Sequence, residues 1–431
     1  MFLRPLRSHL RRMDKYEKWT REQLLERIAT LESTASSTTT PVVISDSNSS
    51  NSNVKQKNKQ KERPFDMSKY SQRHIALKVA YLGWNYMGFA AQTDEETIPT
   101  VEGRLFQALQ RCKLITTVDE CEFTRCGRTD KGVSGLGQVV SLKVRSNGPD
   151  KSEITYVDTL NRLLPEDIRI LAWAPVDANF NSRFDCKSRT YKYFFTKGDL
   201  DLDAMRKGAN YFLGQHDFRN FCKLDPSKNI TNYERRVVSL DINHITPPAP
   251  GLANTEFYEV ELKGTAFLWH QVRCIMSVLF LIGQKLEEPE IVQDLLNISK
   301  IESRPDYPMA SELPLLLYDC EFENIDWVVG KGASMSRIYQ HWRELWSANM
   351  TRALLCQTFM QYMQPFPVDE GKKNLTEYLE IEDRQPTVVL GGGREQKSAR
   401  YKPLLDRQRC DSDEVKKQKY RAKKQKTSNQ Q

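Results

Sequence analysis

An eleven-residue loop constrains this chain more than any other segment, and it runs from Cys126 to Leu136 with the sequence CGRTDKGVSGL. Its three glycines permit tight turns and allow a ligand to approach the backbone closely. Its one carboxylate, Asp130, has two cations nearby, Arg128 and Lys131, which favour the ionised form. The strand-like run 138–144 follows. The pattern indicates a loop carried by a sheet, with an aspartate that serves either catalysis or a plain hairpin turn.

Length and composition restrict the class of protein. With 431 residues, of which 39% are hydrophobic, the chain can form two or three domains, or one large domain with appendages. No apolar run approaches the ~20 residues that a membrane helix needs, so no membrane association is expected. The nine cysteines include no Cys-x-x-Cys pair and the six histidines are dispersed. We therefore expect reduced thiols inside a cell and no metal site.

The charge of the chain is concentrated in its two ends. The total is +8; residues 394–431 carry +8 and residues 1–66 carry +5, which leaves −5 for residues 67–393. A nucleic-acid partner would need a local basic groove on this acidic body, while the ends would add attraction to phosphate that does not depend on sequence. The alternative is that the basic ends only keep the chain soluble.

The first 66 residues are predicted to be a basic helix followed by a disordered linker. Residues 1–13 contain four arginines and no acid, which suits either a mitochondrial presequence or a basic start by chance. Residues 14–33 have the apolar stripe of a short coiled coil or docking helix. Residues 34–63 are rich first in Ser, Thr and Asn and then in Lys and Gln, which is typical of a flexible linker.

Periodicity predicts an α+β fold in the rest of the chain. The predicted strands are 74–81, 138–144, 168–174, 189–195, 233–244, 256–263 and 315–322, and the predicted helices are 100–113, 155–164, 201–213 and 266–284. We expect two similar α/β halves, 67–180 and 181–327, that share a central, mostly antiparallel mixed sheet with the active-site cleft between them. Residues 328–390 are predicted to be a helical, aromatic packing extension, and residues 391–431 a basic disordered tail.

Four further residues have side chains suited to handling a nucleobase or supporting Asp130. The guanidinium of Arg128 can fill the place of a base that leaves its stack, or it can hold a phosphate. Tyr191 and Tyr193 project to one face of their predicted strand, where an aromatic ring can stack on a base. Arg273 lies in an apolar run, so it either faces outward or pairs with a buried acid.

The segment 127–133, Gly-Arg-Thr-Asp-Lys-Gly-Val, resembles the G-R-T-D-x-G-V motif of TruA-type pseudouridine synthases, which isomerise uridine to pseudouridine in RNA. The resemblance implies that Asp130 is the catalytic nucleophile and that Arg128 flips the target base. Residues 189–193 resemble the family's R-x-Y-x-Y element, which implies that Tyr191 packs against that base. Residues 267–273 resemble its F-L-x-H-x-V-R element, which implies that Arg273 pairs with Asp130.

Two more features follow from the same resemblance. Residues 313–317, Leu-Pro-Leu-Leu-Leu, resemble a G-L-x-L string with Pro314 in place of the glycine, which implies that Leu315 lines the uracil pocket. We interpret His270, within the F-L-x-H-x-V-R element, as a structural residue. Further sequence segments, such as His-Asp-Phe-Arg-Asn at 216–220, resemble those of the eukaryotic branch of this family, which modifies tRNA positions 38 and 39 in the anticodon arm.

The resemblance also predicts the partners of the chain. It implies a tRNA substrate, a homodimer in which one tRNA touches both subunits, and no cofactor or metal, because the isomerisation neither oxidises nor hydrolyses anything. The Lys-rich run 416–424 suits nuclear import, RNA contact or a solvated tail, and we expect a nuclear and cytoplasmic protein with a possible mitochondrial fraction.

Three alternatives stay open at this point. The chain could act on other uridines in tRNA or small nuclear RNA, or it could bind RNA through a ferredoxin-like sheet without chemistry. It could also be a coiled-coil scaffold that uses residues 14–33. Within the favoured reading, attack by Asp130 at the ribose C1′ and attack at the uracil C6 are equally compatible with the sequence.

Overall fold

The computed structural model describes Thr20 and residues 65–92, 97–228, 230–245, 256–366, 374–375, 387–397 and 400–428. The chain divides into two compact units, Met1–Arg63 and Pro64–Gln431. Apart from Thr20, all described residues belong to the second unit. The helix predicted at 14–33 and the linker predicted at 34–63 therefore lie outside the described residues, with Thr20 as the single exception.

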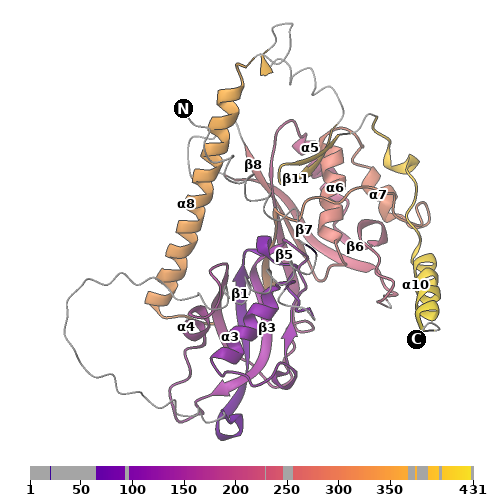
Figure 1. The fold of residues 1–431 in the computed structure, drawn as a ribbon. Coiled ribbons are helices and arrows are strands. Elements are labelled where there is room, and N and C mark those ends of the chain that lie inside the picture. Colours follow the sequence, from indigo (N-terminus) through magenta and orange to yellow (C-terminus); the bar gives the residue numbers. More distant parts are fainter. Residues whose placement is uncertain are drawn as a thin grey trace. The chain divides into compact units, whose positions relative to one another are not determined.

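One ten-stranded sheet organises the second unit (Figure 1). Its strands are β1 (Ser71–Tyr81), β2 (Thr124–Arg125), β3 (Ser134–Ser146), β4 (Ile168–Pro175), β5 (Ser188–Thr196), β6 (Gly214–Asp217), β7 (Glu234–Ile245), β8 (Phe257–Gly264), β9 (Leu315–Glu321) and β10 (Val328–Val329). Their order is β10-β4-β1-β3-β9-β5-β8-β7-β6, and β2 pairs with β3. Among the strand pairs of the described residues, only β3 and β9 are parallel. The prediction of a mixed, mostly antiparallel sheet is confirmed.

Strand β9 joins the part of the sheet that contains β1, β3 and β4 to the part that contains β5 to β8. It follows β5 to β8 in the sequence, yet it lies between β3 and β5. Leu317 of β9 pairs with Gly135 of β3 on one side and with Tyr191 of β5 on the other. The insertion of β9 therefore brings the start of β3, which directly follows residues 127–133 (the Asp130 loop), close to the strand that carries Tyr191.

Two helices pack on the strands β1, β3 and β4, namely α3 (Val101–Arg111) and α4 (Tyr156–Asn161). Helix α3 begins after Thr100, whose side chain accepts a hydrogen bond from the backbone N–H of Gly103. Its residues Val101, Leu105 and Leu109 recur every four positions and are completely buried. Each such side chain contributes roughly 1.5–3 kcal/mol through burial, which holds the helix on the sheet.

Three helices accompany the strands β5, β7 and β8, namely α5 (Leu202–Asn210), α6 (Gln271–Gly283) and α7 (Ile291–Leu296). Almost all of α6 is buried, as its apolar sequence predicts. The helix predicted at 266–284 begins five residues late, however, because His270 has a positive φ of 63° and interrupts the helical backbone. This break decides where the side chains before Gln271 point.

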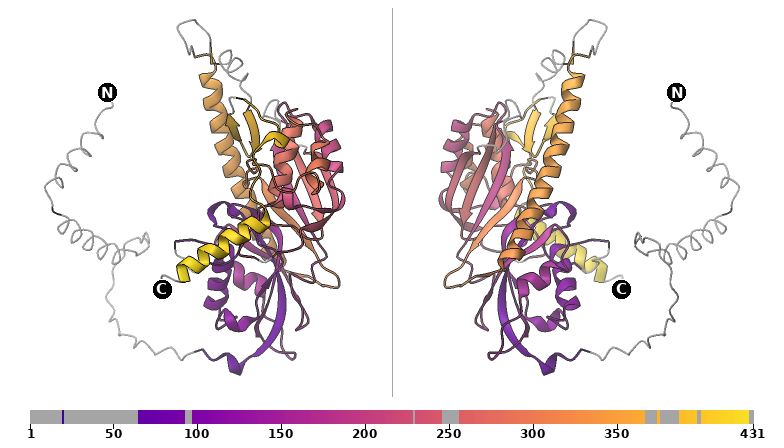
Figure 2. Two further views of the ribbon diagram at one scale, coloured as in Figure 1. Left: turned by 90° about the vertical axis from the view of Figure 1, so that its right-hand side faces the viewer. Right: turned by 90° about the vertical axis from the view of Figure 1, so that its left-hand side faces the viewer.

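The C-terminal region contains more regular structure than predicted. It includes α8 (Gly332–Met363), β11 (Thr387–Gly391), β12 (Arg394–Lys397) and α10 (Asp413–Ser428), as Figures 1 and 2 show. The prediction of a disordered tail over 391–431 is therefore wrong for its described residues. The physical reason is that Leu404 is completely buried in the core and the Tyr401 hydroxyl donates a hydrogen bond to Glu287.

Short 3-10 helices complete the described structure: η1 (Met67–Lys69), η2 (Gly83–Asn85), η3 (Asp119–Cys121), η4 (Arg219–Phe221) and η5 (Leu404–Asp406). Among the described residues, no helix combines the length and the apolar character that crossing a membrane requires. The limits of the two halves, at 67–180 and 181–327, stay predictions.

Candidate active site

The Asp130 loop, residues 127–133, is fastened at both ends by hydrogen bonds. The side chain of Gln138 donates to the carbonyl of Gly127 at 2.8 Å and accepts from its N–H at 3.2 Å. The N–H of Val133 donates to the carbonyl of Asp130 at 3.2 Å. Gly132 has a φ of 78°, and a Cβ there would lie 2.9 Å from the side chain of Glu312, so only glycine fits. The loop is therefore held in one conformation rather than left free.

The carboxylate of Asp130 is half-buried and lies close to ring nitrogens of two neighbouring residues. Trp269 Nε1–H donates to Oδ1 at 3.0 Å, and His270 Nε2 lies 3.3 Å from Oδ2. Burial raises the pKa of Asp130 above its ordinary value, while the Trp269 hydrogen bond and the charges of Arg273 and Lys223 oppose this rise. Burial therefore removes part of the water around the carboxylate, while the neighbouring donors and cations favour its ionised form.

His270 acts on Asp130 as a neutral ring. Burial lowers the pKa of His270 to about 4, and the positive charge of Arg273 adds to this effect. Its Nε2–H can then donate to Asp130, while its Nδ1 is buried and has no hydrogen-bond partner within the described structure. We interpreted His270 from the sequence as structural, yet the left-handed backbone at this residue turns the ring toward the carboxylate.

Two lysines lie over the Trp269 ring. The ammonium groups of Lys223 and Lys228 are 5.1 and 5.8 Å from the centre of the indole. Cations at this distance are attracted to the face of an aromatic ring. They place two positive charges next to Asp130, and both lower its pKa. An anionic ligand such as RNA would find a positive rim around the carboxylate.

Arg273 lies near Asp130 but makes its ion pair with another acid. Its Nη2 donates to Glu312 at 2.9 Å and its Nε donates to the carbonyl of Ala310 at 2.7 Å. Arg394 also lies 3.3 Å from Glu312. No ion pair joins Arg273 to Asp130 in the described part of the chain. The predicted buried acid exists, but it is Glu312, because the segment before β9 passes between α6 and the loop.

Tyr191 lies on β5, and its predicted role against a target base stays a prediction. It is partly buried on β5, and its ring meets Phe267 edge-on, with the ring centres 5.1 Å apart. Burial raises the pKa of its hydroxyl, and the negative charge of Asp130 raises it further. Tyr193, by contrast, is fully buried and donates to the carbonyl of Ser311. Of the two tyrosines, Tyr191 is therefore the one near the carboxylate.

Arg128 and Leu315 are the other two residues that the resemblance named, and their roles stay predictions. Arg128 is exposed, and no ion pair of Arg128 exists among the described residues. Leu315 is buried in the core, where it pairs across the sheet with Tyr193. Leu317, two residues later, pairs with Tyr191, and a Cβ at Gly127 would lie 3.9 Å from its side chain. Leu317 is thus the leucine of this strand that borders both the loop and Tyr191.

Sequence reasoning missed three neighbours of the site, namely Trp269, Glu312 and Lys223. Trp269 stands inside the F-L-x-H-x-V-R element, at the position that the motif leaves undefined. An aromatic residue directly before the histidine was a usable signal. Glu312 and Lys223 carried no local signal, because each reaches the site through a long-range contact.

Comparison with known proteins supplies independent evidence. Residues 209–323 match the family described as tRNA pseudouridine synthase. The human tRNA pseudouridine(38/39) synthase is 41% identical over 375 residues, which cover 81% of this chain and 77% of that protein. The Saccharomyces cerevisiae protein of the same name is 46% identical over 329 residues, covering 72% and 73%. The tRNA pseudouridine synthase A of Archaeoglobus fulgidus is 35% identical over 254 residues, covering 59% and 85%.

Fold and site define an α+β enzyme with a half-buried aspartate on a loop carried by a mixed sheet. The similarity over most of the human and yeast proteins then identifies the family. The chain belongs to the TruA-type tRNA pseudouridine synthases, and it is therefore an isomerase that acts on tRNA.

Proposed function

We propose that this enzyme converts uridine to pseudouridine at positions 38 and 39 of tRNA, in the anticodon arm, with Asp130 as the nucleophile. The names of the human and yeast relatives support the two positions. The single structural observation that carries the role of Asp130 is its half-buried carboxylate, which accepts a hydrogen bond from Trp269 at 3.0 Å on an anchored loop. Such a group can attack carbon once a substrate has displaced the remaining water.

The reaction rearranges bonds within one nucleotide. The bond between uracil N1 and ribose C1′ breaks, the base rotates, and a bond forms between C5 and C1′. The proton on C5 is lost and N1 gains one, so the product has the same atoms as the substrate. Asp130 supplies the nucleophile for the first step, at C1′ or at C6, and its carboxylate is freed in the last step. Both points of attack stay open.

The neighbours of Asp130 have separable roles in this proposal. Arg128, exposed beside the loop, takes the place of the flipped base or holds a phosphate, which offsets the few kcal/mol that flipping costs. Tyr191 stacks on the target base, an interaction worth about 1–3 kcal/mol. Leu317 adds an apolar wall, and Leu315 supports it from the core.

Mapping pseudouridine in cells that lack the protein tests the proposed positions. We expect loss of pseudouridine at tRNA positions 38 and 39, with other positions unchanged. Loss at different tRNA or small nuclear RNA sites would replace the proposed positions. A map without any change would favour a binding protein without chemistry.

A chain that lacks residues 1–66 should keep its activity, whereas a coiled-coil scaffold would lose its function.

The pH dependence of the reaction should follow Asp130. Its pKa lies above the ordinary value, and only the ionised form attacks, so kcat/KM falls as the pH drops through this raised pKa. Trp269→Phe removes a hydrogen bond that lowers the pKa, so its acid limb should move to higher pH. His270 is neutral above about pH 4 and adds no inflection. The control is Trp327→Phe, a tryptophan whose ring lies 6.0 Å from the Lys78 ammonium group. Equal acid limbs in all three proteins would contradict this account.

Salt should weaken tRNA binding steeply. A surface pocket of about 820 Å³ lies between α3 and α8, away from Asp130, and its wall includes Arg104, Arg111 and Arg352. Each phosphate contact contributes about one unit to the slope of log affinity against log salt. The double variant Arg111→Ala/Arg352→Ala should therefore lower that slope by about 2. Filter binding from low to high salt measures it, with Lys300→Ala as the control, and an unchanged slope would exclude this pocket from the tRNA path.

We also propose a homodimer in which one tRNA contacts both subunits. In support, α8 exposes large apolar side chains, among them Tyr339, Phe359, Met360 and Tyr362. A monomer rarely exposes so many along one helix, and a second copy would cover them. Light scattering on the purified chain tests this proposal, since a monomer at micromolar concentration would contradict it.

We also propose that the protein is located in the nucleus and the cytoplasm, with a mitochondrial fraction. The Lys-rich α10 supports nuclear import, and the arginine-rich start of the chain supports the mitochondrial fraction. Imaging of the tagged chain, with and without residues 413–428, tests the nuclear part. An unchanged distribution would remove α10 as the import signal.

A further inference from the structure

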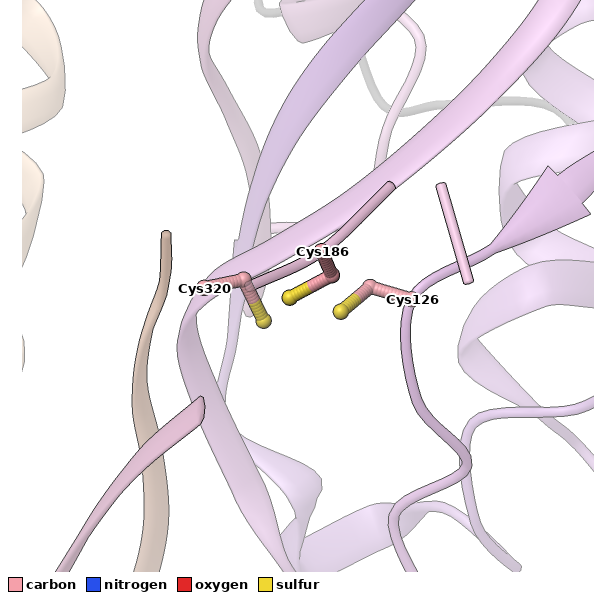
Figure 3. A group of neighbouring side chains, drawn as sticks. All are labelled: Cys126, Cys186 and Cys320. Atoms are coloured by element: carbon pink, nitrogen blue, oxygen red, sulfur yellow. The ribbon is translucent and has the colours of Figure 1, made fainter. Parts of the chain in front are cut away.

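Three cysteines that are far apart in the sequence meet beside the entry to the Asp130 loop. Cys126 follows β2 and directly precedes that loop, Cys186 lies just before β5, and Cys320 lies on β9. All three are buried with free thiols, and their sulfur atoms lie within 4.8 Å of one another. Figure 3 shows the three sulfurs turned toward a common point. No part of the proposed isomerisation uses them.

The spacing of these sulfurs suits a metal ion. Zinc binds thiolate sulfur at ~2.3 Å in tetrahedral geometry, so its sulfur ligands lie about 3.8 Å apart. Side-chain rotations that bring the thiols together by up to about 1 Å would complete three corners of such a site. Apolar neighbours surround the group, among them Val139 and Leu317. A dry, apolar surrounding strengthens metal–thiolate bonds and limits exchange of the ion.

Arg189 gives an independent sign that negative charge belongs here. Its guanidinium donates only to backbone carbonyls, those of Cys126 and Cys186 at 3.3 Å, of Thr265 at 2.7 Å and of Arg183 at 2.8 Å. Within the described residues, no carboxylate pairs with it. A partly buried cation needs a counter-charge nearby. Three thiolates and one Zn²⁺ carry a net charge of −1, which Arg189 neutralises.

We propose that Cys126, Cys186 and Cys320 bind one Zn²⁺ ion, which fastens the start of the Asp130 loop to β5 and β9. Binding releases three thiol protons and forms three zinc–sulfur bonds. The ion is structural and takes no part in the isomerisation. A disulfide between two of the cysteines is a poorer answer, because it leaves the third thiol and the charge of Arg189 unmatched.

The first test measures metal in the intact protein. The full chain is purified from zinc-supplemented cells and dialysed without chelator. Inductively coupled plasma mass spectrometry should then find about one zinc ion per chain. Cys126→Ser, Cys186→Ser and Cys320→Ser should each reduce zinc content at least tenfold. Cys222→Ser removes an equally buried thiol outside the group and should leave the content unchanged. Zinc that persists in all three variants would overturn the proposal.

The second test does not depend on how the variants fold. Cobalt(II) added to the metal-free wild-type chain should produce the near-ultraviolet absorption of thiolate-to-cobalt charge transfer, and added Zn²⁺ should abolish it. Circular dichroism confirms that the same sample is folded. A folded chain that holds no zinc and shows no such absorption would overturn the proposal, as would a disulfide among the three cysteines. Neither readout involves tRNA, so the result is independent of the proposed target positions.

Discussion

Replacing Asp130 by Asn should abolish pseudouridine formation while tRNA binding persists. The carboxamide keeps the size of the side chain and can still accept the hydrogen bond from Trp269, but it is not a nucleophile. We expect the single-turnover rate to fall at least about a thousand-fold, the scale seen when an essential reacting group is removed. Quantifying pseudouridine in transcribed tRNA measures the rate, and filter binding measures the affinity.

The folded state of this variant should not suffer, which makes the result easy to interpret. Burial raises the pKa of Asp130, so the ionised carboxylate is less stable in the folded chain than in the unfolded chain at neutral pH. This unfavourable contribution is lost as the pH falls through the raised pKa, and Asn removes it at every pH. The unfolding midpoint in urea should therefore stay equal or rise.

A matched control separates chemistry from the loss of any aspartate. Asp294 on α7 has a side chain that is 29% exposed, close to the 24% of Asp130. Asp294→Asn should retain full activity. If Asp130→Asn turned over at a rate within tenfold of the wild type, Asp130 would not be the nucleophile.

Replacing Arg273 by Met should weaken both the fold and the reaction. Its guanidinium is the close partner of Glu312, and both side chains are largely buried, 12% and 21% exposed. Removing one partner of such a pair leaves an unmatched charge, and we expect a loss of about 3 kcal/mol of unfolding free energy. The contact of Glu312 with Arg394 keeps the loss at the lower end of the usual range. Urea unfolding followed by tryptophan fluorescence measures it.

The double variant Arg273→Met/Glu312→Gln distinguishes the two roles of this arginine. Since Gln carries no charge, the stability should largely return. The acid limb of the activity should stay displaced to higher pH, because the positive charge that lowers the pKa of Asp130 is still missing. If the acid limb returned to its wild-type position together with the stability, Arg273 would act only by holding Glu312. If Arg273→Met cost less than about 1 kcal/mol, the ion pair would have no structural importance.

Prediction from sequence worked where the signal was local. Alternation and helical spacing predicted the strands at 168–174 and 233–244 and the helix at 201–213 to within a few residues. It worked less well at residue 270, because nothing in the string Trp-His-Gln marks a left-handed backbone. A histidine there is uncommon, and it is held by the contacts of its ring with Asp130 and Trp269.

In the candidate site, too, the residues with a local sequence signal were predicted and the long-range contacts were not. The resemblance named Asp130 and Tyr191, and the structure brings these two side chains into one region, although their roles in catalysis stay predictions. The ion pair of Arg273 could not be deduced, because Glu312 reaches it only when β9 inserts between β3 and β5. The tail from 391 onward was misjudged because its composition is polar, while a few apolar residues such as Leu404 suffice to dock it.

The sequence by itself determined most strands and helices between residues 67 and 327, the loop that carries Asp130 and the family motifs, because each of these depends on residues close together in the chain. Only the tertiary structure decided which charges pair, which leucine faces Tyr191 and that Cys126, Cys186 and Cys320 converge. These contacts join residues that lie many tens of positions apart. They arise from the order of strands in the sheet, which no local pattern encodes.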